Sequence, residues 1–472
     1  MMVLSLLLAT LASAPGAHAE GAAAPQPTSA QALLEQALTL AESVPDAAQR
    51  ADAVGLVAAE LAKTNPKRTV KLVAGQMASH AQSEAMARAA ETLAGDNRLL
   101  GLATLIRVSD RSAALVAIGR IIAMEALIDL DEAVDLTSKM DSLTVRRQTE
   151  REVSRIVWDE LPGDKQKALQ VAVQWAETIL DPLTEGEALA YAAQGAARLQ
   201  GAEAAAPIIS RISSDDARDL AWRLVVQEIA PRDPVGAEAL LGRIGAVFQR
   251  NLAAVSVVAG MAAGGRPADA LRLAREIRSS VEKSLEDPRD QGLILGETAE
   301  AIVGVDHSTA LSILASVWPP VKQYGLQCQL APRVAEKDPK AAREMLEDAW
   351  LELRRMDSPL LREELASEAL TGAMLCAPDL VDAMAKEQPQ IVQNALPRAV
   401  GILAPKHPEL ASKLVERIGD PVAAESAKVA VITAIAGTQP SVAQELAEGL
   451  VSPGARSNAL VALATAMGTA AN

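Results

Sequence analysis

Apolar residues lie on one helical face in the short segment that begins at Pro408, and this segment defines a unit that the chain repeats. Apolar side chains follow the proline at offsets of three, six and ten, a spacing typical of an amphipathic helix. Asp420-Pro421 then interrupts the pattern. A second segment, rich in alanine, valine and isoleucine, ends at Gly437, where glycine can adopt the left-handed cap conformation. One unit is therefore predicted to be two short antiparallel helices.

The same pattern recurs along the chain with a mean period of about 34 residues, within the range of helical repeat arrays. First helices are predicted near positions 34, 66, 96, 130, 165, 202, 234, 267, 307, 339, 378, 408 and 440. A small side chain three positions after a helix start lets neighbouring helices approach closely. Most repeats have alanine there: Ala37, Ala133, Ala168, Ala205, Ala237, Ala270, Ala310, Ala342, Ala411 and Ala443. The exceptions are Thr69, Leu99 and Val381.

Capping residues precede proline at several predicted helix starts, namely Asn65-Pro66, Asp233-Pro234 and Asp338-Pro339. A two-helix unit cannot bury its apolar face alone, so neighbouring units must stack into one core. We therefore predict an all-α fold in which residues 30–472 form a single repeat array, elongated rather than globular. Removing whole units from one end, for example at Pro408, is expected to leave a folded remainder.

Two steps of the repeat are longer than the mean. The step from 267 to 307 contains Ser279 to Asp290, which we interpret as an inserted loop that either contributes to specificity or is tolerated length variation. The step from 339 to 378 is better explained by longer helices through Leu353 and Ala366.

Composition supports helices rather than sheets. Half of the residues are hydrophobic, yet the chain contains one Phe, two Tyr and five Trp, so aliphatic side chains must form the core. The net charge of −15 argues against binding nucleic acid or anionic membranes, both of which attract basic patches. Solubility is the simpler explanation of this acidity.

The first 19 residues have the pattern of a secretory signal peptide. Val3 to Ala14 is an apolar run too short to span a bilayer, and Ala17-His18-Ala19 fits the small-x-small rule for cleavage before Glu20. We expect a cleaved signal peptide at 1–19, a disordered lead-in at 20–29, and a periplasmic or secreted protein. The alternative is an alanine-rich leader that stays attached. No later stretch of the sequence is long and apolar enough to be predicted as a membrane span.

A 34-residue helix-turn-helix unit with proline at the junction resembles the tetratricopeptide class, and more loosely HEAT-type repeats. The Trp, Leu-Gly and Tyr signature of the first tetratricopeptide helix is absent, and Leu414 stands where the Trp would be. The resemblance implies a right-handed α-solenoid of about thirteen antiparallel two-helix repeats. It also implies a binding scaffold rather than an enzyme, with the first helices lining the concave groove.

Residues that could support catalysis are scarce. After the leader the histidines are His80, His307 and His407, and the last two lie three repeats apart, so caps or loops are their expected places. The sequence has no metalloprotease, phosphate-loop or nucleophile-elbow motif, and we predict no metal or cofactor site. The acidic cluster Asp129, Asp131, Glu132 and Asp135 fits a helix start, where carboxylates meet the positive end of the helix dipole.

The two cysteines, Cys328 and Cys376, are predicted to be buried free thiols. When the second helices of their repeats are aligned, Cys376 falls eight residues from Cys328, or about 12 Å along a helix. A disulfide requires Cα atoms within about 7 Å, so this register does not bring the thiols into bonding distance.

Two groups of residues are candidates for partner binding. Arg147, Arg151 and Arg155 share a helix face that could bind a phosphate or an acidic peptide, although nearby carboxylates allow a solvated, ion-paired face instead. Trp318 and Trp350 occupy the same position in adjacent repeats and would form an aromatic pair if exposed; otherwise they fill the helical core.

Taken together, these residues favour an exported helical-repeat scaffold that binds protein or peptide partners and has no catalytic activity of its own. The alternative is a periplasmic carbohydrate-handling protein that uses Trp318 and Trp350 to bind glycan. The sequence predicts neither the identity of a partner nor the oligomeric state.

Overall fold

The protein is helical throughout the described residues. A computed structural model describes residues 29–74, 79–105, 108, 110–140, 142–159 and 163–470. All regular elements in these ranges are helices, namely α2 to α27 and one 3-10 helix, η1 (Leu241–Arg243), which confirms the all-α prediction. The predicted signal peptide and residues 20–28 of the lead-in lie outside the described ranges, while Ser29 caps α2. None of the described helices is long and apolar enough to cross a membrane.

The helices alternate between two layers, which we call outer and inner. The outer helices are α2 (Ala30–Glu42), α4 (Pro66–Val73), α6 (Arg98–Leu105), α8 (Leu130–Ser138), α10 (Lys165–Thr178), α12 (Ala202–Ile209), α14 (Pro234–Leu240), α16 (Pro267–Ser284), α18 (His307–Leu314), α20 (Pro339–Leu353), α22 (Asp379–Glu387), α24 (Pro408–Val415) and α26 (Pro440–Glu448). The inner helices are α3 (Ala47–Leu61), α5 (His80–Asp96), α7 (Arg111–Ala126), α9 (Leu143–Asp159), α11 (Pro182–Gln200), α13 (Asp215–Ile229), α15 (Val247–Ala263), α17 (Pro288–Ile302), α19 (Pro320–Ala335), α21 (Pro359–Cys376), α23 (Pro389–Leu403), α25 (Pro421–Ile435) and α27 (Pro453–Ala470).

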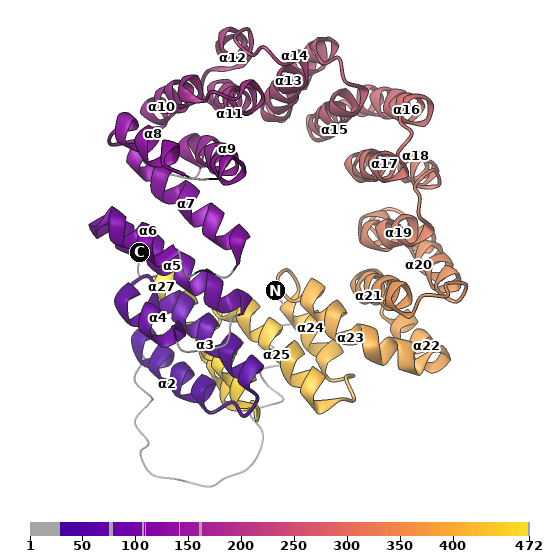
Figure 1. Cartoon of the computed structure of the whole chain (residues 1–472). Helices are drawn as coiled ribbons and strands as arrows, with labels where there is room; N and C mark the ends of the chain where they lie inside the picture. Colours follow the sequence, from indigo (N-terminus) through magenta and orange to yellow (C-terminus); the bar gives the residue numbers. More distant parts are fainter. Residues whose placement is uncertain are drawn as a thin grey trace.

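The two layers curve into a closed ring (Figure 1). From α8 to α22 the odd-numbered helices lie toward the centre and the even-numbered helices lie outside. Each inner helix packs against the inner helices before and after it, and α27 packs against α3 in the same way. Successive outer helices contact each other less, as expected on the wider side of a curved array. The array is therefore a ring, and the expectation of an elongated shape is wrong.

The first and last described helices meet in a shared core that we call the seam. The buried Ser457 hydroxyl donates a hydrogen bond to the carbonyl oxygen of Ala37 at 2.9 Å, across 420 residues of sequence. Elsewhere an outer helix packs against the inner helices on either side of it in the chain, as α12 does with α11 and α13. At the seam α2 packs against α27 and α3, so α27 takes the place of a preceding inner helix. The buried seam residues are Leu33, Leu34, Ala37, Leu38, Ala41, Ala53, Val54, Val57, Leu61, Ile432, Ile435, Ala436, Ala443, Ala447, Leu450, Ala459, Leu460, Leu463 and Ala464.

The capping residues define the helix starts as the sequence predicted. The side chains of Asn65, Asp233 and Asp338 accept backbone N–H groups of α4, α14 and α20, and each helix begins at the following proline. Helices begin at the predicted positions 66, 130, 165, 202, 234, 267, 307, 339, 408 and 440, and within a few residues of 34, 96 and 378. The repeat register is therefore largely confirmed at the level of individual helices.

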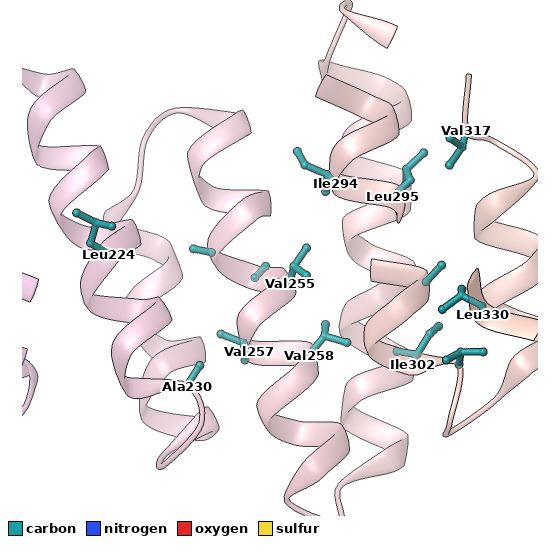
Figure 2. Close-up of a cluster of buried hydrophobic side chains, with 14 of the residues drawn as sticks. Leu224, Ala230, Val255, Val257, Val258, Ile294, Leu295, Ile302, Val317 and Leu330 are labelled. Atoms are coloured by element: carbon teal, nitrogen blue, oxygen red, sulfur yellow. The ribbon is translucent and has the colours of Figure 1, made fainter. Parts of the chain in front are cut away.

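Small residues set the distance between the layers and between neighbouring inner helices. All ten alanines predicted three positions after a helix start are buried: Ala37, Ala133, Ala168, Ala205, Ala237, Ala270, Ala310, Ala342, Ala411 and Ala443. On α15, a Cβ atom at Gly260 would lie 2.2 Å from the carbonyl oxygen of Ala230, just after α13. The close approach of α15 to α13 therefore requires glycine at this position. Figure 2 shows the aliphatic side chains that fill the core nearby, among them Val258 and Leu295.

Successive outer helices are linked by ion pairs between residues about one repeat apart. They include Arg68 with Glu35, Arg98 with Glu132, Arg211 with Glu177, Arg272 with Glu238, Arg343 with Asp379, Arg354 with Glu387, and Arg417 with Asp382. Exposed pairs of this kind contribute about 0.2–1 kcal/mol each. They orient the outer layer more than they stabilise it, and most of the stability must come from the buried aliphatic core.

The long repeat between 267 and 307 differs from the prediction of an inserted loop. Its extra residues extend α16, which continues to Ser284, and the next helix starts at Pro288 after a short connection. Ile277 and Val281 continue the buried stripe of α16, so the added turns bury apolar surface and remain helical. In the other long repeat α20 continues to Leu353 and α21 runs from Pro359 to Cys376, as predicted.

Candidate binding surface

The concave face of the ring is formed by the inner helices. The resemblance to tetratricopeptide repeats implied that the first helix of each repeat would line this face. In this ring the first helices of the repeats are the outer ones, so the implied position of the groove is wrong. The reason lies in burial. Inner α11 buries residues around most of its circumference, from Thr184 to Ala197, because it packs against neighbours on both sides. Outer α4 buries only Thr69 and Val73, which form a single stripe.

Three grooves on the described residues lie between consecutive inner helices. The α5–α7 groove has a volume of ≈ 440 Å³, and the α15–α19 groove has a volume of ≈ 620 Å³. The third, which we call the seam groove, lies between α3, α25 and α27 and has a volume of ≈ 610 Å³. Outer helices contribute no residue to the lining of any of the three. The hollowed surface of these sectors therefore belongs to the inner layer.

The charged side chains of the α5–α7 groove already form ion pairs or hydrogen bonds with one another. His80 Nδ1 lies 2.8 Å from Asp110 Oδ2, and this hydrogen bond lowers the pKa of the Asp110 carboxyl. Arg88 pairs with Glu84 at 2.5 Å, and Arg120 pairs with Glu91 at 3.5 Å. Because these side chains already have partners, an incoming charged ligand would have to displace them.

The α15–α19 groove combines an apolar floor with carboxylates. Small side chains of α15, such as Ala259, form the floor, while Glu297 and Glu300 of α17 line one side. Loss of solvent raises the pKa of the Glu297 carboxyl, and the nearby Glu300 charge adds to this effect. Arg333 donates a hydrogen bond at 2.9 Å to the backbone oxygen of Glu300, not to its side chain. This groove offers a carboxylate pair to a ligand.

Arg223 on α13, like Glu297 and Glu300, was not predicted from the sequence to be a site residue. Desolvation lowers the pKa of its guanidinium. Its Nη1 donates to Gln227 Oε1 at 3.2 Å, whereas its buried Nε has no hydrogen-bond partner. Such residues carry no local sequence signature.

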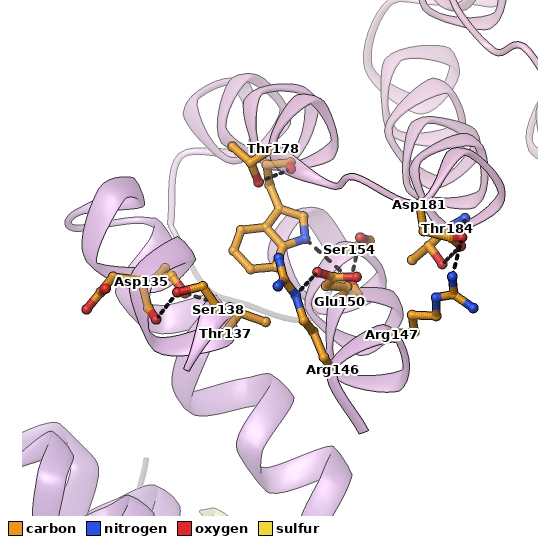
Figure 3. A network of polar contacts seen from close by, with 12 residues as sticks. Asp135, Thr137, Ser138, Arg146, Arg147, Glu150, Ser154, Thr178, Asp181 and Thr184 are labelled. Carbon is orange, nitrogen blue, oxygen red and sulfur yellow. Dashed lines mark hydrogen bonds and ion pairs between the residues drawn. The ribbon is translucent and has the colours of Figure 1, made fainter. Parts of the chain in front are cut away.

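The arginine stripe lies on inner helix α9 and is ion-paired, and Figure 3 shows its Arg147 beside Asp181. Arg147 reaches Asp181 at 2.7 Å and Arg151 reaches Glu187 at 2.5 Å, so both connect α9 to α11. Arg155 pairs with Glu152 at 3.0 Å within the same helix. These contacts favour the ion-paired alternative over a ready-made phosphate site.

The tryptophan pair does not form on the surface. Trp318, before α19, is 60% exposed, whereas Trp350 on α20 is 4% exposed. Trp350 Nε1 donates to Glu387 Oε2 at 3.0 Å and so connects the outer helices α20 and α22. Neither alternative holds for both residues: Trp350 fills the space between helices, whereas Trp318 is exposed. Only Trp318 remains accessible to a partner.

The histidines and the acidic cluster have structural contacts. His307 and His407 lie at helix starts, and His307 Nε2 is 3.8 Å from Asp338 Oδ2. Asp129 caps α8 by accepting the N–H of Glu132 at 3.1 Å. No group of three or more His, Cys, Asp or Glu side chains in the described ranges could hold a metal ion.

The two cysteines are free thiols, as predicted. Burial raises the pKa of both: strongly for the fully buried Cys328, and to about 11 for the partly buried Cys376. Since the thiolate is the reactive form, a pKa of about 11 makes Cys376 roughly 200-fold less ionised at pH 8 than an ordinary cysteine.

We therefore expect slow labelling of the folded protein by a disulfide reagent at pH 8, with Cys376 reacting before Cys328. Both thiols should react at once in guanidinium chloride. A Cys376→Ser variant would leave Cys328 as a reporter of unfolding. Rapid, stoichiometric labelling of the folded chain would contradict this assignment.

Comparison with known proteins does not assign the chain to a family. No family model matches the chain, and no curated protein matches it. A solved structure of Ton1535 from Thermococcus onnurineus NA1 is 13% identical, with 74% of this chain and 99% of that chain covered and a TM-score of 0.22. An engineered protein from a structural genomics consortium is 14% identical, with 92% and 99% covered and a TM-score of 0.16. Similarities this weak carry no argument about fold or function.

Proposed function

We propose that the chain is an exported helical-repeat scaffold that binds protein or peptide partners on the inner face of its ring. In this proposal it has no catalytic activity of its own. It belongs with tetratricopeptide-like and HEAT-like arrays, as a right-handed stack of about thirteen two-helix repeats. Its signal peptide is removed after Ala19, which places it in the periplasm or outside the cell. Amino-terminal sequencing of the mature protein should then begin at Glu20.

The position of the grooves carries this proposal. All three lie between inner helices, where the lining mixes aliphatic side chains with carboxylates and hydroxyl groups. Concave surfaces with a few polar groups on an apolar floor are typical of binding sites. The rigid, closely packed inner layer would hold such a surface in one shape, which limits the conformational entropy lost on binding.

Site-specific photocrosslinking in the native cell tests the inner face. A photoreactive residue at Ser256, in the α15–α19 groove, is compared with one at Ser441, on the outer helix α26. We expect one reproducible partner from Ser256 and none from Ser441, followed by binding of that partner in purified form. Equal capture at both positions, or capture at Ser441 alone, would argue against an inner binding face.

A glycan-binding function is the second candidate, and the exposure of Trp318 is the observation that favours it. In that case Trp318→Ala should release the protein from cell-wall glycan. Unchanged retention of the Trp318→Ala variant would remove this candidate. A hydrolase screen of the mature chain separates both binding proposals from an enzyme.

A further inference from the structure

The seam groove differs from the other two grooves because the first and the last described inner helices both line it. Gln49, Asp52, Ala53 and Leu56 come from α3, the first inner helix. The opposite side comes from the last two inner helices and the turn before α27: Val422, Glu425, Ser426, Val429, Ser452, Gly454, Ala455 and Asn458. A molecule bound here would therefore contact both sides of the joint that closes the ring.

The polar part of this groove is negative and lacks a balancing cation. Asp52 and Glu425 contribute carboxylates, and no lysine or arginine is among the lining residues. Glu425 accepts the N–H groups of Val451 at 2.6 Å and Ser452 at 2.9 Å, which fixes the carboxylate without neutralising it. Asp52 is exposed and forms no ion pair or hydrogen bond within the described part of the chain. The buried Oδ1 atom of Asn458 also lacks a donor.

The apolar part of the groove favours a cationic ligand that also carries aliphatic side chains. Leu56 is 37% exposed and Val422 is 77% exposed, although both lie beside the buried seam core. Val429 and Ala455 extend this surface into the groove. A bare inorganic cation would leave these side chains in water. A lysine or arginine flanked by leucine or valine would cover them and meet the carboxylates.

We propose that the seam groove binds a basic, aliphatic peptide segment of a partner protein and thereby holds the ring closed. This inference rests on the proposed function, because it names one site and one partner chemistry on the inner face. Binding needs the α3 and α27 sides together, so it stabilises the closed ring over any state with a separated seam. By reciprocity, closure of the seam raises the affinity for the peptide.

The probe is a fluorescein-labelled heptapeptide with two lysines among leucine and alanine, blocked at both ends. Its control carries glutamate in place of lysine. Fluorescence anisotropy with the mature full-length protein should show binding of the lysine peptide only, weakening as salt is added. Asp52→Asn should weaken binding about three- to fivefold, the effect of one exposed ion pair. Asp52→Lys should abolish lysine-peptide binding and permit the glutamate peptide to bind.

Two further variants locate the site. Glu203→Gln, on the outer helix α12, should leave the affinity unchanged, since Glu203 is exposed and lies away from the grooves. Glu297→Gln tests the α15–α19 groove. If Glu297→Gln abolished binding while Asp52→Lys did not, the peptide would bind the α15–α19 groove and the seam proposal would be wrong. Equal binding of the lysine and glutamate peptides would also overturn it.

Hydrogen exchange measures the effect on closure. The lysine peptide should slow amide exchange in α2 and α27 of the native protein, and should not do so in Asp52→Lys. Binding without this protection would refute the clamping of the ring. Peptide-independent protection that rises with protein concentration would instead assign the groove to a second copy of the chain. The absence of any partner crosslinked from Ser256 would contradict the proposed binding function of the inner face. The peptide experiments contradict only the seam groove, so the two proposals can fail separately.

Discussion

Deleting α27, by ending the chain after Gly449, should destabilise the amino-terminal repeats far more than loss of one terminal repeat would in an open array. The deletion removes Leu460 and Leu463 from the seam and exposes the faces of α2 and α3 that they cover. Each large aliphatic side chain that loses burial costs about 1.5–3 kcal/mol, so we expect a loss of several kcal/mol. Hydrogen exchange in α2 and α3 and the radius of gyration in solution measure this change.

The expected pattern separates a ring from an open array. In an open array the deletion would leave α2 and α3 as protected as before, because they lie at the far end of the chain. In the ring their exchange should accelerate and the radius of gyration should rise. Ser457→Ala is the mild control, because it removes one buried hydrogen bond worth about 1 kcal/mol and leaves the apolar seam in place. Unchanged exchange in α2 after the deletion would contradict closure.

Trp175→Ala should be among the most destabilising single substitutions in the chain. Trp175 on α10 is 1% exposed, and its Nε1 donates to the backbone oxygen of Glu150 on α9 at 3.3 Å. Truncation of a buried tryptophan leaves a large cavity and costs about 3–5 kcal/mol. The midpoint of urea denaturation should therefore fall markedly.

Trp318→Ala provides a matched control for that substitution. The same side chain is removed from a position that is 60% exposed, where substitutions usually change stability by within about 0.5 kcal/mol. Trp175→Phe should fall between the two, because it keeps much of the volume but loses the hydrogen bond. Similar costs for Trp175→Ala and Trp318→Ala would show that the burial described for Trp175 is wrong.

The repeat could be predicted from the sequence because its signals are local. Asn65 and Asp233 cap helices with their own side chains, and alanines such as Ala237 meet the neighbouring layer at a fixed offset. Closure could not be predicted in this way. It depends on small rotations between repeats that accumulate around the ring, and no single residue encodes their sum. One signal was available: α2 and α27 carry apolar faces at the two ends, where an open array would need polar caps.

The candidate site was harder to predict because its contacts join different repeats. Arg147 and Asp181 are 34 residues apart, one repeat period, so a search within one helix does not reveal the pair. Asp52 has no local signature, and its role depends on α25 and α27 lying beside α3. The exposure of Trp318 and the burial of Trp350 likewise depend on packing between helices, although both occupy the same repeat position.

The hydrogen bond from Ser457 to Ala37 also has a consequence for folding kinetics. Contacts between the described helices lie mainly within one repeat or between neighbouring repeats, whereas this one spans 420 residues and carries a large loop-closure entropy. Repeats can form one after another along the chain, but the ring can seal only when α27 is complete. During synthesis the apolar face of α2 therefore stays exposed to solvent until α27 has been made and can cover it. Aggregation or chaperone binding at that face competes with correct folding until the chain is finished.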